Sequence, residues 1–499
     1  MLQLTASDIY SYYRPSECNL RIYLRHRGDE EAPPGPYEQV LFRLAERHER
    51  RHLAAFTDVV DLSEVQWDKR FNATVEALTT TTGVIYQGAF SAQVTIDGVV
   101  CGIIGNPDFL IKSGDRCVIR DSKISRRINE DDHPEILRQL ELYGWLYEHT
   151  CGKPPRGLEV HSGTGTIVPI AYDGGGRVLD LLARILRNKL AASEVYEPVG
   201  WSKCDGCGFF GRCWPRAEAR KDIALVGGVD QGLARALHER GIQSFDGLLE
   251  QLDEAQLAAL ERPWGNRVQR VGARAPGILR NARALAERRE ILLQQPVLAD
   301  CAHYVMLDLE GLPPHLDETE KIYLWGLDVH GQNASGHQAA TAGFGVEGDR
   351  QGWEDFLRIA GSVFARYGDL PFVHWSHYER TKVDMYLKRH GDRGGVGARV
   401  IRNLLNLLPI TQQALVLPLS SYSLKVVEAY VGFKRERPGI GGDWAMARYI
   451  QAIETEDPDE RAAVMAEILD YNREDLAATL AVFEWLKRKG AADTNTPRA

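Results

Sequence analysis

GNPDFLI at residues 105–111 and RDSKIS at residues 120–125 are two short runs that each carry an acidic residue beside apolar ones. Asp108 precedes the apolar residues of the first run, and Asp121 comes just after the apolar residues 117–119, with Lys123 two positions on. Residues i and i+2 of a strand point to the same face, so Asp121 and Lys123 project together. If the two runs pair as neighbouring strands, Asp108 joins them. Two carboxylates suit Mg2+ or Mn2+, and with the lysine they have the spacing of a metal-dependent nuclease.

The triplet D-x-K is common, and taken alone it is better explained as the rim of a surface hairpin. Its surroundings favour the nuclease. The runs lie in a region, residues 60–125, that alternates in the manner of strands, with turn signals at Asp97-Gly98 and at residues 113–115. A helix is predicted over residues 133–150, and Gln139 and Tyr143 share one face of it.

Composition indicates a soluble globular protein. The 499 residues suffice for two to four domains, and 44% of them are hydrophobic and 26% charged. We find no apolar run of membrane-spanning length and no signal peptide, so a cytoplasmic location is expected. The net charge of −9 argues against a uniformly basic coat and predicts that nucleic-acid contacts are local.

Three of the eight cysteines are bunched in WSKCDGCGFFGRCW at residues 201–214. Cys204, Cys207 and Cys213 need a fourth ligand, and Cys18 is the natural candidate. In a cytosolic chain this pattern favours metal ligation over disulfides. Four thiolates suit zinc or an iron–sulfur cluster, and spacing does not choose between them.

Residues 221–290 change character and predict a helix, a Gly-Gly turn at Gly227 and Gly228, and two further helices. This is a helix-hairpin-helix pattern whose backbone N–H groups can hold a phosphate. A second, weaker copy is predicted at residues 264–285, which carry five arginines. A helical linker without a ligand is the alternative, and the residues favour neither.

A further domain begins near residue 302. HYVMLDLEGL reads as a strand with Asp308 and Glu310 on one face, followed by a partner strand. Glu379 lies at a later strand–helix junction, and a long terminal helix carries Tyr471 and Asp475 one turn apart. Four acidic residues from these elements are the ligands that a site for two divalent cations requires, and Tyr471 is placed to position a water molecule.

The N-terminal motifs together resemble the RecB-like PD-(D/E)xK nucleases, especially the iron–sulfur branch that includes the CRISPR-adaptation exonucleases. The resemblance covers about the first 215 residues. It implies an active site of a helix histidine, a strand aspartate, an acid-x-Lys pair and a Q-x-x-x-Y helix. On this sequence these are His48, Asp108, Asp121 with Lys123, and Gln139 with Tyr143. His48, Asp108 and Asp121 are then the metal ligands. The resemblance also implies a [4Fe–4S] cluster on Cys18, Cys204, Cys207 and Cys213, with Zn2+ as the alternative.

The last 190 residues resemble the DnaQ-like, RNase H-fold 3′–5′ exonucleases. Asp308 and Glu310 match the D-x-E motif, and Tyr471 and Asp475 match Y-x-x-x-D. Glu379 departs from the family, which has aspartate there. The whole arrangement is similar to RecB-like nucleases with an added RNase H-like domain, some of which are joined to or encoded near superfamily 1 helicases.

The sequence therefore predicts an α/β multidomain protein. We expect a PD-(D/E)xK module at residues 1–218, a helix-hairpin-helix linker at 219–296, an RNase H-like exonuclease fold at 297–488 and a disordered tail at 489–499. The predicted activity is metal-dependent hydrolysis of DNA, single-stranded or with free ends. Two alternatives remain open: an RNA-processing nuclease, and a nucleic-acid-binding scaffold with a dead site that serves a helicase.

Overall fold

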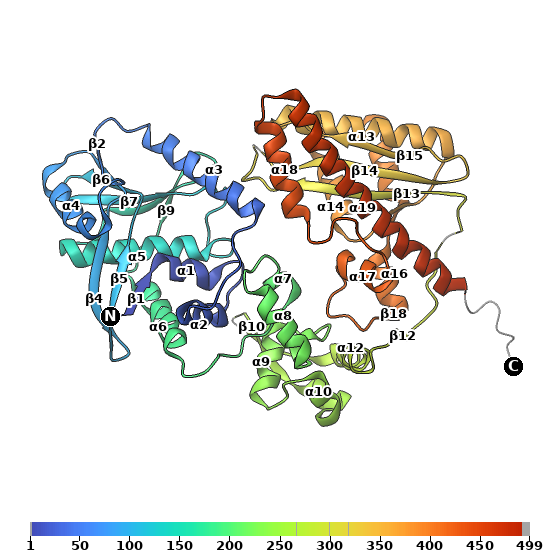
Figure 1. Cartoon of the computed structure of the whole chain (residues 1–499), viewed down its shortest axis with the longest axis horizontal. Coiled ribbons are helices and arrows are strands. Elements are labelled where there is room, and N and C mark those ends of the chain that lie inside the picture. Colours follow the sequence, from blue (N-terminus) through green and yellow to red (C-terminus); the bar gives the residue numbers. More distant parts are fainter. Residues whose placement is uncertain (1, 266, 299, 318, 492–499) are drawn as a thin grey trace. The chain divides into compact units, whose positions relative to one another are not determined.

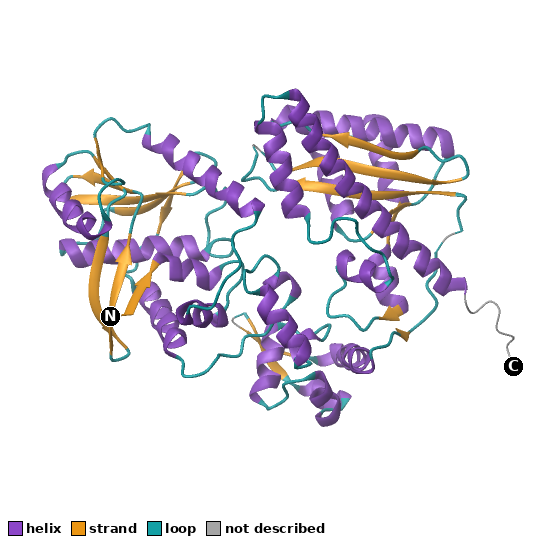
Figure 2. Ribbon diagram, viewed as in Figure 1, coloured by secondary structure: helices purple, strands orange, loops and turns teal. Residues whose placement is uncertain are grey.

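The computed structural model describes residues 2–265, 267–298, 300–317 and 319–491. The chain forms two compact units. The first comprises residues 1–34, 38–198 and 202–213, and the second comprises residues 35–37, 199–201 and 214–499. Figure 1 colours the chain by sequence position, and Figure 2 separates helices from strands.

The first unit mixes strands and helices. Its strands are β1 (Leu2–Thr5), β2 (Val59–Asp61), β3 (Val84–Tyr86), β4 (Phe90–Ile96), β5 (Val99–Gly105), β6 (Phe109–Ser113), β7 (Arg116–Ser122), β8 (Gly157–His161) and β9 (Ile167–Ile170). Its helices are α1 (Ala6–Tyr13), α2 (Asn19–Arg27), α3 (Pro36–Leu53), α4 (Trp67–Thr80), α5 (Pro134–Cys151) and α6 (Gly176–Leu190). Two short helices, α7 (Trp201–Cys204) and α8 (Phe210–Ala219), lead into the second unit.

Two sheets of the first unit meet where β5 ends and β6 begins. One sheet has the order β1-β5-β4, and the other has the order β2-β3-β6-β7-β8-β9. Strands β6 and β7 pair antiparallel with Phe109 opposite Arg120, so Asp108, one residue earlier, comes opposite Asp121. Helix α5 packs its buried leucines, among them Leu140 and Leu146, into the core that the strands share. The pairing that the sequence predicts for the two runs is thus present.

The second unit begins with a small helical module around its own hydrophobic cluster. Its elements are η1 (Ile223–Leu225), α9 (Gln231–Glu239), α10 (Phe245–Gln251), α11 (Glu254–Ala259), β10 (Glu261–Trp264), β11 (Arg267–Arg270), η2 (Gly272–Arg274) and α12 (Ala275–Glu287). Gly228 and Gly241, with φ of +90° and +81°, make the turns between the first elements, where a side chain would be strained.

The rest of the second unit is built on a sheet in the order β15-β14-β13-β16-β17. Its elements are β12 (Ile291–Leu292), β13 (His303–Leu312), β14 (Lys321–Gly331), β15 (Gly336–Thr341), α13 (Gly345–Tyr367), β16 (Phe372–His374), α14 (Tyr378–His390), η3 (Arg393–Gly395), α15 (Val396–Asn403), β17 (Leu404–Asn406), α16 (Leu407–Ala414), β18 (Leu415–Val416), α17 (Leu424–Tyr430), α18 (Gly442–Glu454) and α19 (Pro458–Ala491). No helix in the described ranges is both long and apolar enough to cross a membrane.

Strand β13 divides its side chains between two faces. Val305, Leu307 and Leu309 belong to one hydrophobic cluster, which includes α13, whereas Met306 belongs to another, which includes α19. Alternate residues of a strand face opposite sides, so Asp308 and Glu310 share the face of Met306 and turn toward α19. The sheet thus presents the D-x-E pair to the terminal helix.

Three sequence-based expectations are wrong. Residues 67–80, predicted to alternate as strands, form α4; its buried positions, Thr74 and Ala77, follow helical spacing although its threonines favour strands. The predicted second helical copy begins instead with the β10–β11 hairpin, because Arg267 to Arg270 continue as a strand after the turn. The predicted tail at 489–499 starts too early, because α19 continues to Ala491; residues 492–499 lie outside the described part of the chain.

Candidate active sites

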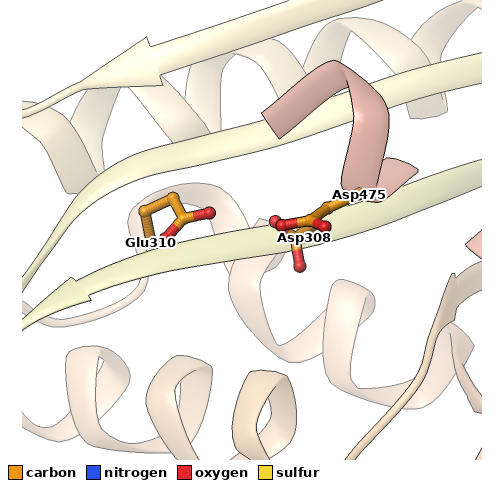
Figure 3. A group of neighbouring side chains, drawn as sticks. All are labelled: Asp308, Glu310 and Asp475. Atoms are coloured by element: carbon orange, nitrogen blue, oxygen red, sulfur yellow. The ribbon is translucent and has the colours of Figure 1, made fainter. Parts of the chain in front are cut away.

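Three acidic side chains meet between β13 and α19. Asp308, Glu310 and Asp475 each offer an oxygen, and these oxygens lie within 4.8 Å of one another (Figure 3). Glu310 and Asp475 are buried, with 7% and 8% of their surface exposed. Carboxylates this close repel one another when all are ionised, so the group is suited to a cation.

The pKa values record this repulsion. Burial, followed by the charges of Asp475 and Glu310, raises the pKa of Asp308 well above its usual range. Burial and Asp475 raise the pKa of Glu310 to about 8. Burial also raises the pKa of Asp475, although the guanidinium of Arg435 opposes this. Glu310 therefore keeps its proton near neutral pH, and full ionisation of all three acids is opposed unless a cation neutralises them.

Helix α19 holds Asp308 through Asn472, a residue that the sequence reasoning did not select. The Asn472 amide Nδ2 donates to Asp308 Oδ2 at 2.7 Å. Gly326 lies opposite Asp308 on β14 and leaves room for the Asn472 side chain. A Cβ at Gly326 would lie 1.8 Å from Asn472 Oδ1. The sequence feature that could have identified Asn472 is its position inside the Tyr471-x-x-x-Asp475 motif.

Arg435 is a second residue that sequence reasoning missed. Its guanidinium pairs with Asp475 and with the buried Glu428, whose Oε1 lies 2.5 Å from Arg435 Nε. The arginine side chain is only 8% exposed. Burial opposes its charge, but hydrogen bonds to Glu428 and Asp475 raise the pKa of Arg435. One positive charge thus already lies against this acidic group.

The other two residues predicted for this site lie beside the three acids. Tyr471 is buried, and burial followed by the charges of Asp475 and Glu310 raises its pKa. Glu379 accepts hydrogen bonds from His374 Nδ1 at 3.0 Å and from Ser376 Oγ at 3.2 Å. Its charge contributes to the raised pKa of Asp308, so Glu379 is a neighbour of the three acids but not one of them.

In the first unit, Asp108, Asp121 and Lys123 come together as the spacing predicts. The Asp108 N–H donates to Asp121 Oδ1 at 3.0 Å, and Lys123 Nζ lies 3.0 Å from Asp121 Oδ2. Burial and the Asp121 charge raise the pKa of Asp108. Burial opposes the charge of Lys123, but Asp121 and Asp108 raise its pKa, so the lysine stays protonated.

Helix α3 supplies a third carboxylate, Glu49, which the sequence reasoning did not choose. Its Oε1 accepts hydrogen bonds from Tyr86 Oη and Gln87 Nε2, both at 2.7 Å. Gln87 Nε2 also lies 3.3 Å from Asp108 Oδ1 and so links the two acids. Gln87 has a φ of +55°, an uncommon backbone conformation for a residue other than glycine.

His48, the predicted metal ligand, has its described contacts with His161. Its Nε2 lies 3.2 Å from the His161 carbonyl oxygen, and the two rings stack at 4.5 Å. His52 stacks on His161 as well, with 3.8 Å between ring centroids. Helix α3 thus places Glu49 near Asp108, and it places His48 and His52 against His161 of β8.

Gln139 and Tyr143 form a pair on α5. Gln139 Nε2 donates to Tyr143 Oη at 2.7 Å. Tyr143 is buried, and burial followed by the Asp121 charge raises its pKa, which places its hydroxyl in the field of the acidic site. Gly105 makes room, because a Cβ there would lie 2.7 Å from the Tyr143 ring.

The comparison with protein families bears on the second unit. Residues 305–487 match the RNase H superfamily model. This segment includes Asp308, Glu310 and Asp475, and it supports the RNase H-like part of the predicted fold and a nuclease that acts on nucleic acids. No curated protein matches the chain. The crystal structure of SSO0001 is similar at 14% identity and a TM-score of 0.21, over 35% of this chain and 96% of that one.

The cysteines of the predicted cluster lie in the first unit. Cys18, Cys207 and Cys213 pack against the same buried residues, Leu20, Leu24 and Phe209. The Cys207 N–H donates to the Cys204 carbonyl at 3.0 Å, so the fourth cysteine belongs to the same turn. Burial, with a smaller effect of Glu197, raises the pKa of Cys18 to about 12.

The predicted phosphate-binding glycines lie in the turn before α9. The Gly227 carbonyl accepts a hydrogen bond from Asn281 Nδ2 at 3.0 Å, and a Cβ at Gly228 would lie 3.0 Å from the Ile278 side chain. Both contacts are with α12. The turn is therefore packed on that helix.

Proposed function

We propose that the chain is a metal-dependent nuclease that hydrolyses phosphodiester bonds of DNA in the cytoplasm, with one active site in each unit. The preferred substrates are single strands and free ends, which a superfamily 1 helicase would supply as partner. The observation that carries the proposal is the meeting of Asp308, Glu310 and Asp475 inside the segment that matches the RNase H superfamily.

The second-unit residues fit Mg2+ or Mn2+. Two buried carboxylates and the half-buried Asp308, with raised pKa values and oxygens within 4.8 Å of one another, are a donor set for a hard cation. Asp308, Glu310 and Asp475 would hold the metal, and Glu379 would contribute from beside them. A bound divalent cation supplies Lewis acidity toward the phosphodiester and toward water.

The chain's own residues then orient the reaction. Asn472 fixes one oxygen of Asp308 by its hydrogen bond, so the other oxygen is left for the cation. Tyr471 stays protonated because its pKa is raised, and its hydroxyl can donate to a water molecule or a phosphate oxygen. Arg435 adds positive charge next to Asp475, where the phosphate of a substrate would be attracted.

In the first unit, Asp108 and Asp121 would hold the metal with Glu49 as a further carboxylate, and His48 would join them only after leaving His161. Lys123 keeps its proton and offsets negative charge that develops on the phosphate. Gln139 and Tyr143 are hydrogen-bonded to each other on α5 and form one border of the site.

We also propose a [4Fe–4S] cluster on Cys18, Cys204, Cys207 and Cys213. A single zinc ion with Zn–S bonds of about 2.3 Å needs sulfurs about 4 Å apart, whereas a four-iron cluster binds each thiolate on a separate iron. The packing of Cys18, Cys207 and Cys213 around Phe209 supports one shared metal group, with Zn2+ as the alternative to the cluster.

A nuclease assay on end-labelled single- and double-stranded DNA, with matched RNA, tests the function. The wild type is compared with Asp121→Asn, Asp308→Asn and the double variant in Mg2+ or Mn2+. The exposed Asp115 and Asp369, each paired with a surface cation, provide the controls Asp115→Asn and Asp369→Asn. We expect each site variant to remove a distinct part of the DNA products.

The outcomes separate the alternatives. Cleavage of RNA in preference to DNA would make the chain an RNA-processing enzyme. If Asp121→Asn alone abolished all cleavage, the second unit would be a binding module. If the wild type bound but cut neither polymer, the chain would be a scaffold and the nuclease proposal would be wrong.

A further inference from the structure

The β10–β11 hairpin displays an exposed tryptophan on a strongly basic stretch. Trp264 is 55% exposed and Val268 is 70% exposed. Residues 261–290 contain eight arginines and three glutamates but no lysine or aspartate, a net charge of +5 in a chain of net charge −9. An aromatic side chain among arginines is the combination with which proteins bind single-stranded nucleic acid, because bases stack on the ring and phosphates pair with the cations.

The strand register places the tryptophan and an arginine on one face. Trp264 pairs with Arg267, and Arg262 pairs with Gln269, across the antiparallel hairpin. Directly opposed residues share a face, so these four side chains lie together. Pro263 and Val268 lie on the opposite face. In the described residues no ion pair engages Arg267, so its guanidinium is available to a phosphate.

The base of the hairpin is anchored, which holds the indole in place. Arg262 is 2% exposed, and its Nη2 lies 3.0 Å from Oδ2 of Asp230, the residue that caps α9. A Cβ at Gly232 would lie 2.2 Å from the Pro263 carbonyl oxygen, so the backbones of α9 and β10 are in close contact. A preorganised platform loses little entropy when it binds.

One face of the indole is already occupied. The Arg262 guanidinium carbon lies 4.5 Å from the centre of the Trp264 ring, a cation–π contact. Arg274 approaches the same carboxylate, Asp230, at 3.5 Å, so a second cation lies near. The exposed remainder of the ring offers a flat surface to one further planar group, and the surrounding charge selects an anionic polymer with unpaired bases.

We infer that the β10–β11 hairpin binds a single-stranded nucleic acid by stacking one base on Trp264 and holding the adjoining phosphate with Arg267. This rests on the proposed function and moves the main contact of the helical module from the Gly227-Gly228 turn to the hairpin. Stacking is available to any base, so the contact positions a strand without reading its sequence. Duplex DNA, whose bases are already stacked, binds the hairpin less well.

Fluorescence anisotropy of a labelled oligothymidine and of a matched duplex, with the full chain in EDTA, measures binding without cleavage. We expect Trp264→Ala to weaken single-strand binding at least about fivefold, the lower limit for loss of one stacked base. Trp264→Phe should stay within about twofold of wild type, because a ring remains to stack. Arg267→Gln should lower the slope of log affinity against log salt by about 1.

Two control variants are matched to the chain. Trp67 on α4 is 51% exposed with the Arg70 guanidinium 5.5 Å from its ring, and Val268 lies on the other face of the same hairpin. Trp67→Ala and Val268→Ala should bind like wild type. All variants should unfold at the wild-type midpoint, because each altered side chain is exposed.

The assay distinguishes failure of this inference from failure of the proposed function. If the wild type cuts DNA in Mg2+ and Trp264→Ala binds as tightly as wild type, the hairpin site is wrong and the nuclease stands. The same holds if Trp67→Ala weakens binding equally. If the wild type neither binds nor cuts single strands, both proposals fall.

Discussion

Asn472 connects the sheet to the terminal helix through a single hydrogen bond. Its amide holds Asp308, and its own position depends on the absence of a side chain at Gly326. Asn472 is fully buried, so the contact is shielded from water. A buried hydrogen bond to a charged group contributes about 1.5–3 kcal/mol, and this one also sets the direction of a proposed metal ligand.

Gly326→Ala should therefore damage the site from the neighbouring strand. The added methyl group would meet Asn472 Oδ1 at 1.8 Å, and such overpacking costs about 1–3 kcal/mol. We expect a lower free energy of unfolding and at least tenfold less cleavage by the second-unit site. Gly277→Ala is the control, because a Cβ there has open space. Wild-type stability and cleavage in Gly326→Ala would show that Asn472 does not hold Asp308.

Arg435 pairs its positive charge with two buried acids. Its removal should therefore lower the free energy of unfolding most when no metal is bound. Arg435→Gln leaves Glu428 and Asp475 without their cation, and breaking a buried pair costs about 3–5 kcal/mol. We expect a loss of stability in EDTA that Mg2+ partly restores, measured by urea unfolding. Arg350→Gln, at an exposed pair, should leave the free energy of unfolding close to the wild-type value. Equal losses with and without Mg2+ would contradict a metal at Asp475.

At the scale of elements, α3 and β8 form a stack of three imidazoles. His52 and His161 lie on each other, and His48 lies on the other side of His161. Burial, followed by neighbouring positive charge, lowers the pKa of both His52 and His161 to about 4. Both rings are therefore neutral at pH 7 in the folded protein.

This stack predicts that the first unit loses stability in acid. Unfolded histidine has a pKa of about 6.5, so between pH 6.5 and 4 the unfolded chain binds more protons, and stability falls as pH falls. We expect a loss of about 1–3 kcal/mol over this window. His52→Phe keeps an aromatic ring and should flatten the pH dependence measured by urea unfolding at pH 7 and 4.5. An unchanged slope would mean that His52 titrates normally.

Elements with clear periodicity were predictable, and those set by distant contacts were not. The strand at 303–312 and the alternation at Asp121 and Lys123 follow directly from residue spacing. Helix α4 was missed because its threonines favour strands locally, and only packing against the sheet selects the helix. The β10–β11 hairpin was missed because residues 264–285 were interpreted as a second copy of the helix-hairpin-helix pattern.

The acidic ligands were predictable, but their supporting residues were not. Asp308, Glu310 and Asp475 follow a spacing that chemistry recognises. Arg435 lies in a loop without periodicity, and its partner Asp475 is 40 residues away. Glu49 was passed over for its neighbour His48, because sequence does not show which of two adjacent helix residues turns toward Asp108.

At the scale of the whole molecule, two units carry separate cores and separate acidic groups. In both, an aspartate has a raised pKa because burial and a neighbouring acid oppose its ionisation. Each unit is thus strained by its own site when no cation is present. The unfolding of each unit should show the effect of its own site separately, because ligand binding stabilises only the part of the chain that binds the ligand.

The second unit should become less stable as pH rises when metal is withheld. The folded pKa of Glu310 is about 8 and that of Asp308 is also raised, so above pH 4 the folded state binds more protons than the unfolded chain. Its unfolding free energy in EDTA should therefore fall between pH 4 and 8, and saturating Mg2+ should remove the fall. Calorimetry between pH 4 and 8, in EDTA and in saturating Mg2+, measures the fall in the unfolding free energy and its removal by the metal.

Asp308→Asn provides the decisive variant, because the amide removes one charge at constant shape. We expect it to stabilise the metal-free second unit at pH 8 by about 1–3 kcal/mol while abolishing the Mg2+ effect there. Asp108→Asn should do the same for the first unit only, and Asp369→Asn, at an exposed pair, should do neither. If Asp308→Asn destabilised the metal-free chain, the three acids would be a structural network held by Arg435, and the metal site would have to be sought elsewhere.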